Sequence, residues 1–137
     1  MYKADRYDVK GKQYLKTLEK YYLVDIGLRH LLLGDRNTDI GHILENIVYL
    51  ELIRRGYIVH VGKVGEKEID FIAQKGDEKI YYQVAASVID PSTFKREIEP
   101  LKKINDNYPK LILSMDDFPI GEDGIKQVNI IEFLLET

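Results

Sequence analysis

The chain has 137 residues, a length that suits one domain. With 45% hydrophobic and 31% charged residues, its composition excludes a disordered tail or a fibre. The absence of cysteine excludes a disulfide scaffold, thiol catalysis and cysteine-ligated metal sites, and it favours a cytoplasmic setting. The apolar runs fall short of the roughly 18 residues that a membrane span needs, and the first residues lack the apolar stretch of a signal peptide.

The formal net charge of −3 is unevenly distributed along the chain. Residues 1–29 carry seven Lys and Arg against four Asp and Glu, whereas residues 115–137 carry one Lys against six Asp and Glu. A strong nucleic-acid binder usually has a basic stripe and a high pI, and the pI of this chain is about 5.6. The basic segment is therefore either an ordinary solvated surface or a surface that faces phosphates or an acidic partner.

Residues 1–38 are expected to form a basic arm and a short helix that pack on a core of residues 39–137, as one compact domain. Within the arm, residues 21–25 are aromatic and β-branched, which is typical of an extended segment, and residues 26–33 suit a short helix.

The strongest helical pattern runs from Asp39 to Arg55, with Thr38 or Asp39 as its cap and Gly56 just beyond its end. One face of this helix collects Ile40, Ile43, Leu44, Ile47, Val48 and Glu51. Because a buried carboxylate must be paired, Glu51 is expected to contact a tyrosine or an arginine, or alternatively to share in a functional site.

The rest of the core alternates strands and helices. The expected strands are 57–63, 68–74, 80–87, 111–114 and 125–130, and the expected helices begin at Asp90 and at Ile131. In the second strand, alternation places Ile69, Phe71 and Ala73 on one face. A helix between the third and fourth strands makes a parallel crossover, so the pattern predicts an α/β domain with a mixed sheet flanked by helices.

Several common functional motifs are absent from the sequence. No phosphate-binding loop, no Gly-x-Gly-x-x-Gly after a strand and no Gly-x-Ser-x-Gly occurs. The histidines His30, His42 and His60 show no metal-ligand spacing, so we expect structural or surface roles for them.

What remains is a pattern of oxygen-bearing side chains on elements that the topology brings together. Glu45 lies on the main helix, Asp70 on the second strand and Gln83 on the third. Mg²⁺ prefers oxygen ligands, and these three side chains would supply them. The alternative without a functional role is that Asp70 acts as a cap or pairs with Arg54 or Arg55, and that Glu45 is a solvated helix residue.

A helix Glu, a strand Asp and then a Glu or Gln followed by x-Lys are typical of the PD-(D/E)XK nuclease-like superfamily. The chain more specifically resembles the C-terminal domain of unknown function of prokaryotic AAA-superfamily ATPases. The matching segments, which together span nearly all of residues 7–135, are 20–29, 39–46, 54–57, 68–71, 82–84, 96–98, 106–110 and 133–135.

This resemblance implies a restriction-endonuclease-like core and an attached ATPase domain that this chain lacks. It also implies catalytic and metal-binding roles for Glu45, Asp70 and Gln83. Where an active nuclease has Glu-x-Lys, however, this chain has Gln83-Val84-Ala85. The lysine of that motif helps to orient and deprotonate water and offsets developing charge, which Ala85 cannot do.

The leading expectation is therefore a cytoplasmic, C-terminal accessory module of an AAA-type ATPase, with a degenerate and inactive site, that acts in binding or regulation. The alternative is a Mg²⁺-dependent DNA or RNA phosphodiesterase in which Lys95 or Arg96 replaces the missing lysine. The ten tyrosines also suit an interface of a homo-oligomer, although tyrosine packs cores as well.

Overall fold

The structure is a computed structural model that describes residues 37–117 and 120–136. The arm expected over residues 1–38, with its extended segment and short helix, lies outside the described residues apart from its last two positions. Within the described part of the chain, no helix is long and apolar enough to cross a membrane.

Six strands form one mixed sheet in the order β1-β2-β3-β4-β6-β5. The elements are α2 (Asn37–Arg54), β1 (Ile58–Val64), β2 (Lys67–Lys75), β3 (Glu78–Val84), α3 (Pro91–Lys102), β4 (Lys110–Ser114), β5 (Gly121–Glu122), β6 (Ile125–Asn129) and α4 (Ile130–Leu135). Pairing is antiparallel for β1–β2, β2–β3 and β5–β6, and parallel for β3–β4 and β4–β6. The predicted mixed α/β architecture, with a parallel crossover through α3, is confirmed.

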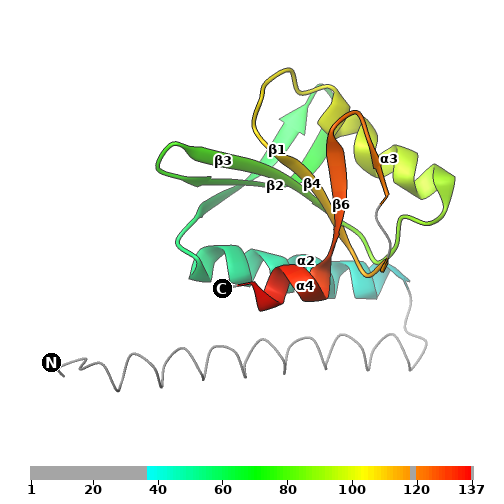
Figure 1. Cartoon of the computed structure of the whole chain (residues 1–137), viewed down its shortest axis with the longest axis horizontal. Coiled ribbons are helices and arrows are strands. Elements are labelled where there is room, and N and C mark those ends of the chain that lie inside the picture. Colours follow the sequence, from blue (N-terminus) through cyan, green and yellow to red (C-terminus); the bar gives the residue numbers. More distant parts are fainter. Residues whose placement is uncertain (1–36, 118–119, 137) are drawn as a thin grey trace, which may run out of the picture.

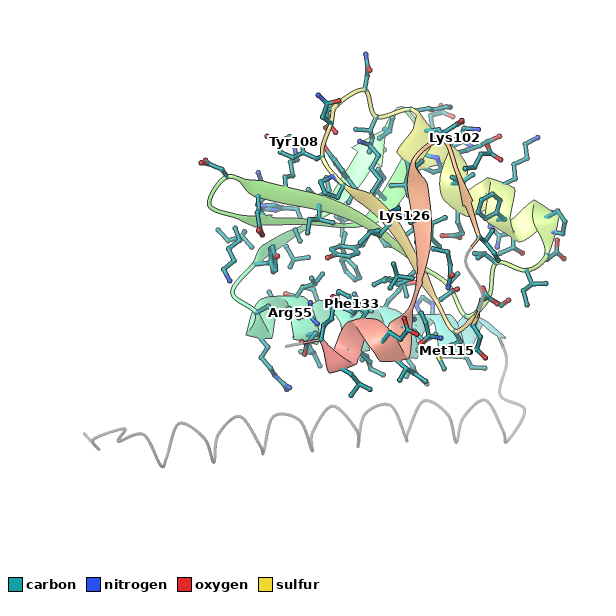
Figure 2. All side chains as sticks on the ribbon, in the orientation of Figure 1. Arg55, Lys102, Tyr108, Met115, Lys126 and Phe133 are labelled. Atoms are coloured by element: carbon teal, nitrogen blue, oxygen red, sulfur yellow. The ribbon has the colours of Figure 1, made fainter. Side chains whose placement is uncertain are left out.

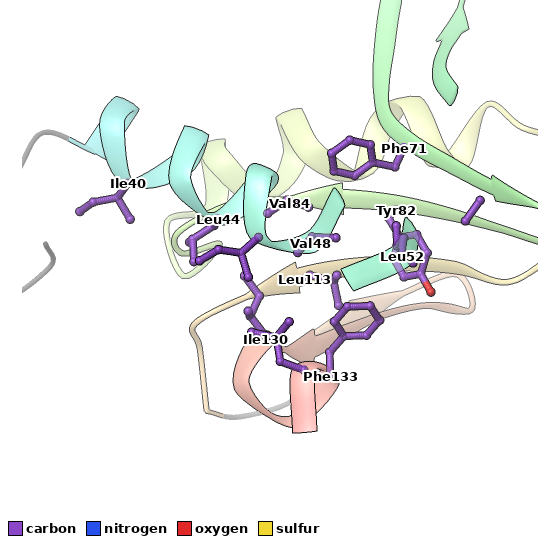
Figure 3. Close-up of a cluster of buried hydrophobic side chains, with 13 residues drawn as sticks. Ile40, Leu44, Val48, Leu52, Phe71, Tyr82, Val84, Leu113, Ile130 and Phe133 are labelled. Atoms are coloured by element: carbon purple, nitrogen blue, oxygen red, sulfur yellow. The ribbon is translucent and has the colours of Figure 1, made fainter. Parts of the chain in front are cut away.

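The sheet separates two layers of helices (Figure 1). On one face, α2 and α4 cover a cluster that includes Leu44, Val48, Leu113 and Phe133 (Figure 3). On the other face, α3 contributes Ile98 and Leu101 to a second cluster. The strand β3 lies between the two layers and its last four residues are buried, as expected of a central strand.

Helix α2 follows the predicted apolar stripe and begins two residues before the predicted start. The helix already includes Asn37, so Thr38 and Asp39 stand within it rather than before it. The predicted end is confirmed: Gly56 has φ +93°, its N–H donates to Ile53 O, and Tyr57 N–H donates to Leu52 O. This pair of bonds satisfies carbonyls at the helix end and requires a left-handed residue, which glycine adopts without strain.

Strand β2 does not alternate regularly as the sequence predicts. His60 pairs with Ile72 and Gly62 pairs with Ile69, so Asp70 and Phe71 together stand opposite one residue of β1. This β-bulge shifts the alternation, and Ile69 packs in the α3-side cluster while Phe71 packs in the α2-side cluster. The prediction that Ile69 and Phe71 share a face is therefore wrong, and the reason is a bulge at Asp70.

Helix α3 begins as predicted. Asp90 caps it by accepting a hydrogen bond from Ser92 N at 2.8 Å, and Pro91 takes the first helical position. The strand before it is shorter than predicted, since β3 ends at Val84 rather than at Ser87. Ala85, Ala86 and Ser87 therefore lie outside the strand, and they line a cleft.

The predicted partner of Glu51 is an arginine. Glu51 is 4% exposed and its Oε2 accepts a hydrogen bond from Arg55 Nε at 2.7 Å. The same guanidinium donates to Phe133 O and lies 4.3 Å from the centre of the Phe133 ring, where α2 and α4 meet (Figure 2). Arg55 therefore joins the two helices that cover one face of the sheet.

We predict that Arg55→Ala lowers the free energy of unfolding by about 3 kcal/mol, because it leaves the buried Glu51 carboxylate without its closest cation. Urea denaturation would measure the change. The double variant Glu51→Leu with Arg55→Leu should recover part of the loss, since it removes both charges. Equal losses in the two variants would contradict this role for the ion pair.

Candidate active site

The candidate site lies where β2 and β3 separate. Their ladder ends at the pair Phe71–Tyr82, although both strands continue beyond it. In place of backbone bonds, Val84 N donates to Asp70 Oδ2 at 2.8 Å and Asp70 N donates to Gln83 Oε1 at 2.9 Å. Side chains therefore satisfy the backbone groups that this fork would leave unpaired. The carboxylate of Asp70 thus accepts a backbone hydrogen bond. Among the described residues it forms no ion pair with Arg54 or Arg55, which both lie beside Glu51, so the predicted alternative of such a pair is wrong.

Gln83 connects the fork to α3. Its side chain is buried, and while its oxygen accepts from Asp70 N, its nitrogen donates to Glu97 O at 3.0 Å. A carboxylate could not make the second of these bonds, because it has no hydrogen to donate. The amide of Gln83 thus holds strand and helix together, and its role as a metal ligand remains a prediction.

A cleft of about 460 Å³ opens beside the fork. It is lined by Gly41, His42, Glu45, Val84, Ala85, Ala86, Ser87, Asp90, Thr93, Arg96 and Glu97. A second hollow of about 360 Å³ is lined by His42, Glu45, Asn46, Tyr49 and Phe71. Because both hollows share His42 and Glu45, they lie side by side along α2.

A buried network supports the wall of the cleft. Asp116 is 6% exposed and accepts hydrogen bonds from Val88 N, Ser87 Oγ and Ser114 Oγ at 2.7–2.8 Å. These bonds hold the pKa of Asp116 below its usual value despite the burial that opposes them. The loop that follows β3 is thereby fixed to the end of β4.

Three carboxyl groups around the fork act on one another. Burial raises the pKa of Asp70 to about 6. The charges of Glu45 and Glu68 also raise this pKa, whereas the hydrogen bond from Val84 N lowers it. Burial, together with the charges of Asp70 and Glu45, raises the pKa of Glu97 to about 7 despite the nearby Arg96. Burial also raises the pKa of Glu45, and His42 partly offsets this. Shifts of this kind gather at functional sites, so they support the choice of this cleft.

The structure separates the two candidates for the migrated cation. Arg96 lines the cleft, with its Nε 3.9 Å from Glu97 Oε2. Lys95 has a 77% exposed side chain, lies 4.0 Å from Glu99 and is not among the lining residues. Ala85, at the position of the motif lysine, lines the cleft and brings no charge to it.

The donor set does not suit a metal ion in its present arrangement. Over residues 37–117 and 120–136, no group of three or more His, Asp or Glu side chains is placed so that it could hold one. The charge of Glu45 helps to raise the pKa of Asp70, whereas the side chain of Gln83 is occupied by backbone partners. We therefore derive no chemistry that depends on a bound metal.

Sequence reasoning missed Glu97 as a member of the site. Its position is one that the sequence could have flagged, because Phe94, Glu97, Ile98 and Leu101 share one face of α3. A carboxylate within an apolar stripe is the same signal that singled out Glu51. His42, expected to be structural or on the surface, is an exposed residue that lines both hollows.

Comparison with known proteins finds a longer relative. The chain is 45% identical over 136 residues to an uncharacterized protein of Haemophilus influenzae, a match that covers 98% of this chain and 33% of the relative. The chain thus spans about a third of the length of the curated relative that it matches. No family model matches the chain. No solved structure matches it either.

We predict that stability falls as the pH rises from about 4 to about 7. The raised pKa values of Asp70 and Glu97 mean that the folded state holds more protons than the unfolded state in this range, so ionisation favours unfolding. Glu97→Gln removes one of the two groups and should reduce the fall by about 2 kcal/mol, as measured by urea denaturation at pH 5 and pH 8.

Glu99→Gln is the matched control. Glu99 lies on the same helix, but its hydrogen bond with Lys67 lowers its pKa, so it is ionised in both states above pH 5. Its replacement should leave the pH dependence between pH 5 and pH 8 unchanged. An unchanged pH dependence in Glu97→Gln would contradict the environment described for that carboxyl group.

Proposed function

We propose that the chain is a module with a restriction-endonuclease-like fold whose site is degenerate and serves in binding or regulation rather than in hydrolysis. The observation that carries this proposal is Ala85, an uncharged side chain that lines the cleft where the PD-(D/E)XK pattern has its lysine. Without that cation, the site has no group at this position to activate water or to offset developing charge.

The arrangement of elements supports the fold named in this proposal. A mixed sheet lies between helices, Glu45 comes from a helix on one face, and Asp70 and Gln83 come from adjacent antiparallel strands. The bulge and the fork direct Asp70 toward Val84 at the edge of the cleft. These are the placements that the resemblance implies for the residues of the motif.

The bonds of Gln83 support the loss of catalysis. Its amide makes two backbone hydrogen bonds that differ in direction, one accepted and one donated. A Glu at this position would place a carboxylate against the carbonyl oxygen of Glu97, so glutamine suits the packed fork better than the Glu of the nuclease pattern would. In this proposal Gln83 makes a structural contact where an active nuclease has a metal ligand.

We further propose that an AAA-type ATPase domain is the partner of this module. Two thirds of the length of the Haemophilus influenzae relative lie outside the match, which leaves room for such a domain in that protein. In this arrangement the module would contribute a binding surface and the ATPase would contribute the energy of nucleotide hydrolysis.

An active Mg²⁺-dependent phosphodiesterase is the second candidate. The observation in its favour is Arg96, a cation on the wall of the same cleft and 3.9 Å from Glu97. Its side chain is 70% exposed, however, and the described acidic residues do not form a metal site. We therefore place this candidate second.

We predict that the chain takes up no Mg²⁺ at millimolar concentration and nicks no plasmid. Calorimetric titration with MgCl₂ and a supercoiled-plasmid assay would measure the two quantities, with Asp70→Asn as the comparison. Nicking that requires Mg²⁺ and disappears in Asp70→Asn would overturn the proposal.

A matched pair of variants would then identify the cation. If Arg96 has replaced the lysine, Arg96→Ala abolishes nicking and Lys95→Ala leaves it intact, since only Arg96 lines the cleft.

A further inference from the structure

The cleft carries more negative than positive charge among its described residues. Glu45, Asp90 and Glu97 line it. The charge of Glu45 helps to raise the pKa of Glu97, so these two carboxyl groups lie close together. Arg96 lines the cleft at 3.9 Å from Glu97 and is largely exposed, and His42 lies close enough to Glu45 to offset part of the rise that burial causes in its pKa. A cleft of this kind favours a ligand that brings a positive charge with it.

The adjoining hollow is aromatic, which is a separate feature from the charge. Tyr49 is 40% exposed and its ring centre lies 6.0 Å from that of Phe71, with the planes tilted by 36°. Phe71 is 9% exposed and lies at the edge of the α2-side cluster, on the opposite side from Ile130 and Phe133 (Figure 3). The buried ring supports the exposed one, so Tyr49 presents a ring that is already in position.

The two features are joined through one stripe of helix α2. His42, Glu45, Asn46 and Tyr49 are spaced at i, i+3, i+4 and i+7, and all four line the same hollow. Tyr49 follows Glu45 by four residues, which is about 6 Å along the helix axis. A planar group lying on the ring of Tyr49 can therefore reach the carboxylate of Glu45.

We propose that this double hollow binds the guanidinium group of an arginine from a basic segment of a partner protein, stacked on Tyr49 and paired with Glu45. This inference rests on the proposed function as a binding module and names the chemistry of its partner. Asn46 adds an amide oxygen that can accept a further hydrogen bond from the same group.

An arginine fits the cleft better than the other cations do. A metal site built from protein side chains alone needs several converging ligands, and no group of three or more His, Asp or Glu side chains provides them among the described residues. A guanidinium group makes no such demand, because it is planar, pairs with a carboxylate through two N–H groups and stacks on aromatic faces. A nucleic acid would instead bring phosphates toward three carboxyl groups, so repulsion disfavours it.

The test uses the full 137-residue chain and a blocked hexapeptide with the sequence (Gly-Arg)₃. Its comparison is the same peptide with citrulline, which is neutral and nearly the same shape as arginine. The chain contains no tryptophan, so Tyr49→Trp introduces a single indole whose fluorescence reports contact with the peptide. Chemical shifts in ¹H–¹⁵N spectra of the unsubstituted chain locate the contact and give the dissociation constant.

We expect the arginine peptide, and not the citrulline peptide, to shift the signals of His42, Asn46 and Tyr49. Tyr49→Ala should weaken binding about 3- to 10-fold and Glu45→Gln about 5-fold, through lost stacking and lost charge pairing respectively. Tyr49→Phe keeps the ring and should bind within about 2-fold of the parent. Leu50→Ala is the matched control, since Leu50 is 47% exposed on the same helix and does not line the hollow.

Equal binding of the two peptides, or unchanged binding by Tyr49→Ala, would overturn the inference. So would the absence of binding at 5 mM peptide. These results are distinct from failure of the proposed function, which shows itself as Mg²⁺-dependent nicking of plasmid.

Discussion

The bulge at Asp70 is the constraint on which the candidate site depends. It changes the alternation of β2 at the point where β2 separates from β3, so the carboxylate of Asp70 can accept a hydrogen bond from Val84 N instead of following the regular pattern of the strand. The bond from Asp70 N to Gln83, and the bond from Gln83 to Glu97 O, then join β2, β3 and α3. Bulges commonly redirect side chains in this way beside functional sites.

The same arrangement explains the electrostatics of the cleft. It draws carboxyl groups from α2, β2 and α3 into partly buried positions and supplies little positive charge to balance them. An active nuclease of the PD-(D/E)XK pattern would place a lysine and a metal ion there, whereas this chain has Ala85 and an amide that is occupied by backbone groups. A positively charged partner that binds the cleft would lower the free energy of the ionised carboxyl groups. This is the physical basis for proposing a binding role.

Local signals predicted much of the fold. The apolar stripe of α2, the glycine at its end and the Asp-Pro start of α3 each act within one or two helical turns, so the sequence alone reveals them. The partner of Glu51 was predictable in kind, because a carboxylate in an apolar stripe requires a cation or a hydrogen-bond donor.

The site was only partly predictable because its geometry depends on strand pairing. Nothing in the alternation of β2 indicates that Asp70 and Phe71 share one partner residue on β1, since a bulge is a property of two strands together. Glu97 went unrecognised for a similar reason: its place beside Asp70 follows from the crossover of α3 over the sheet. The choice between Lys95 and Arg96 required the position of the cleft relative to α3, which depends on how α2, β3 and α3 pack together.

Titration of the carboxyl carbons of Asp70 and Glu97 by ¹³C NMR, in the absence of divalent cations, tests the central claim most directly. The environment of the cleft predicts a pKa of about 6 for Asp70 and about 7 for Glu97. Assignment of each signal would come from Asp70→Asn and Glu97→Gln. Values for both groups at or below those of exposed carboxyl groups, about 4, would contradict a buried and uncompensated set of acids.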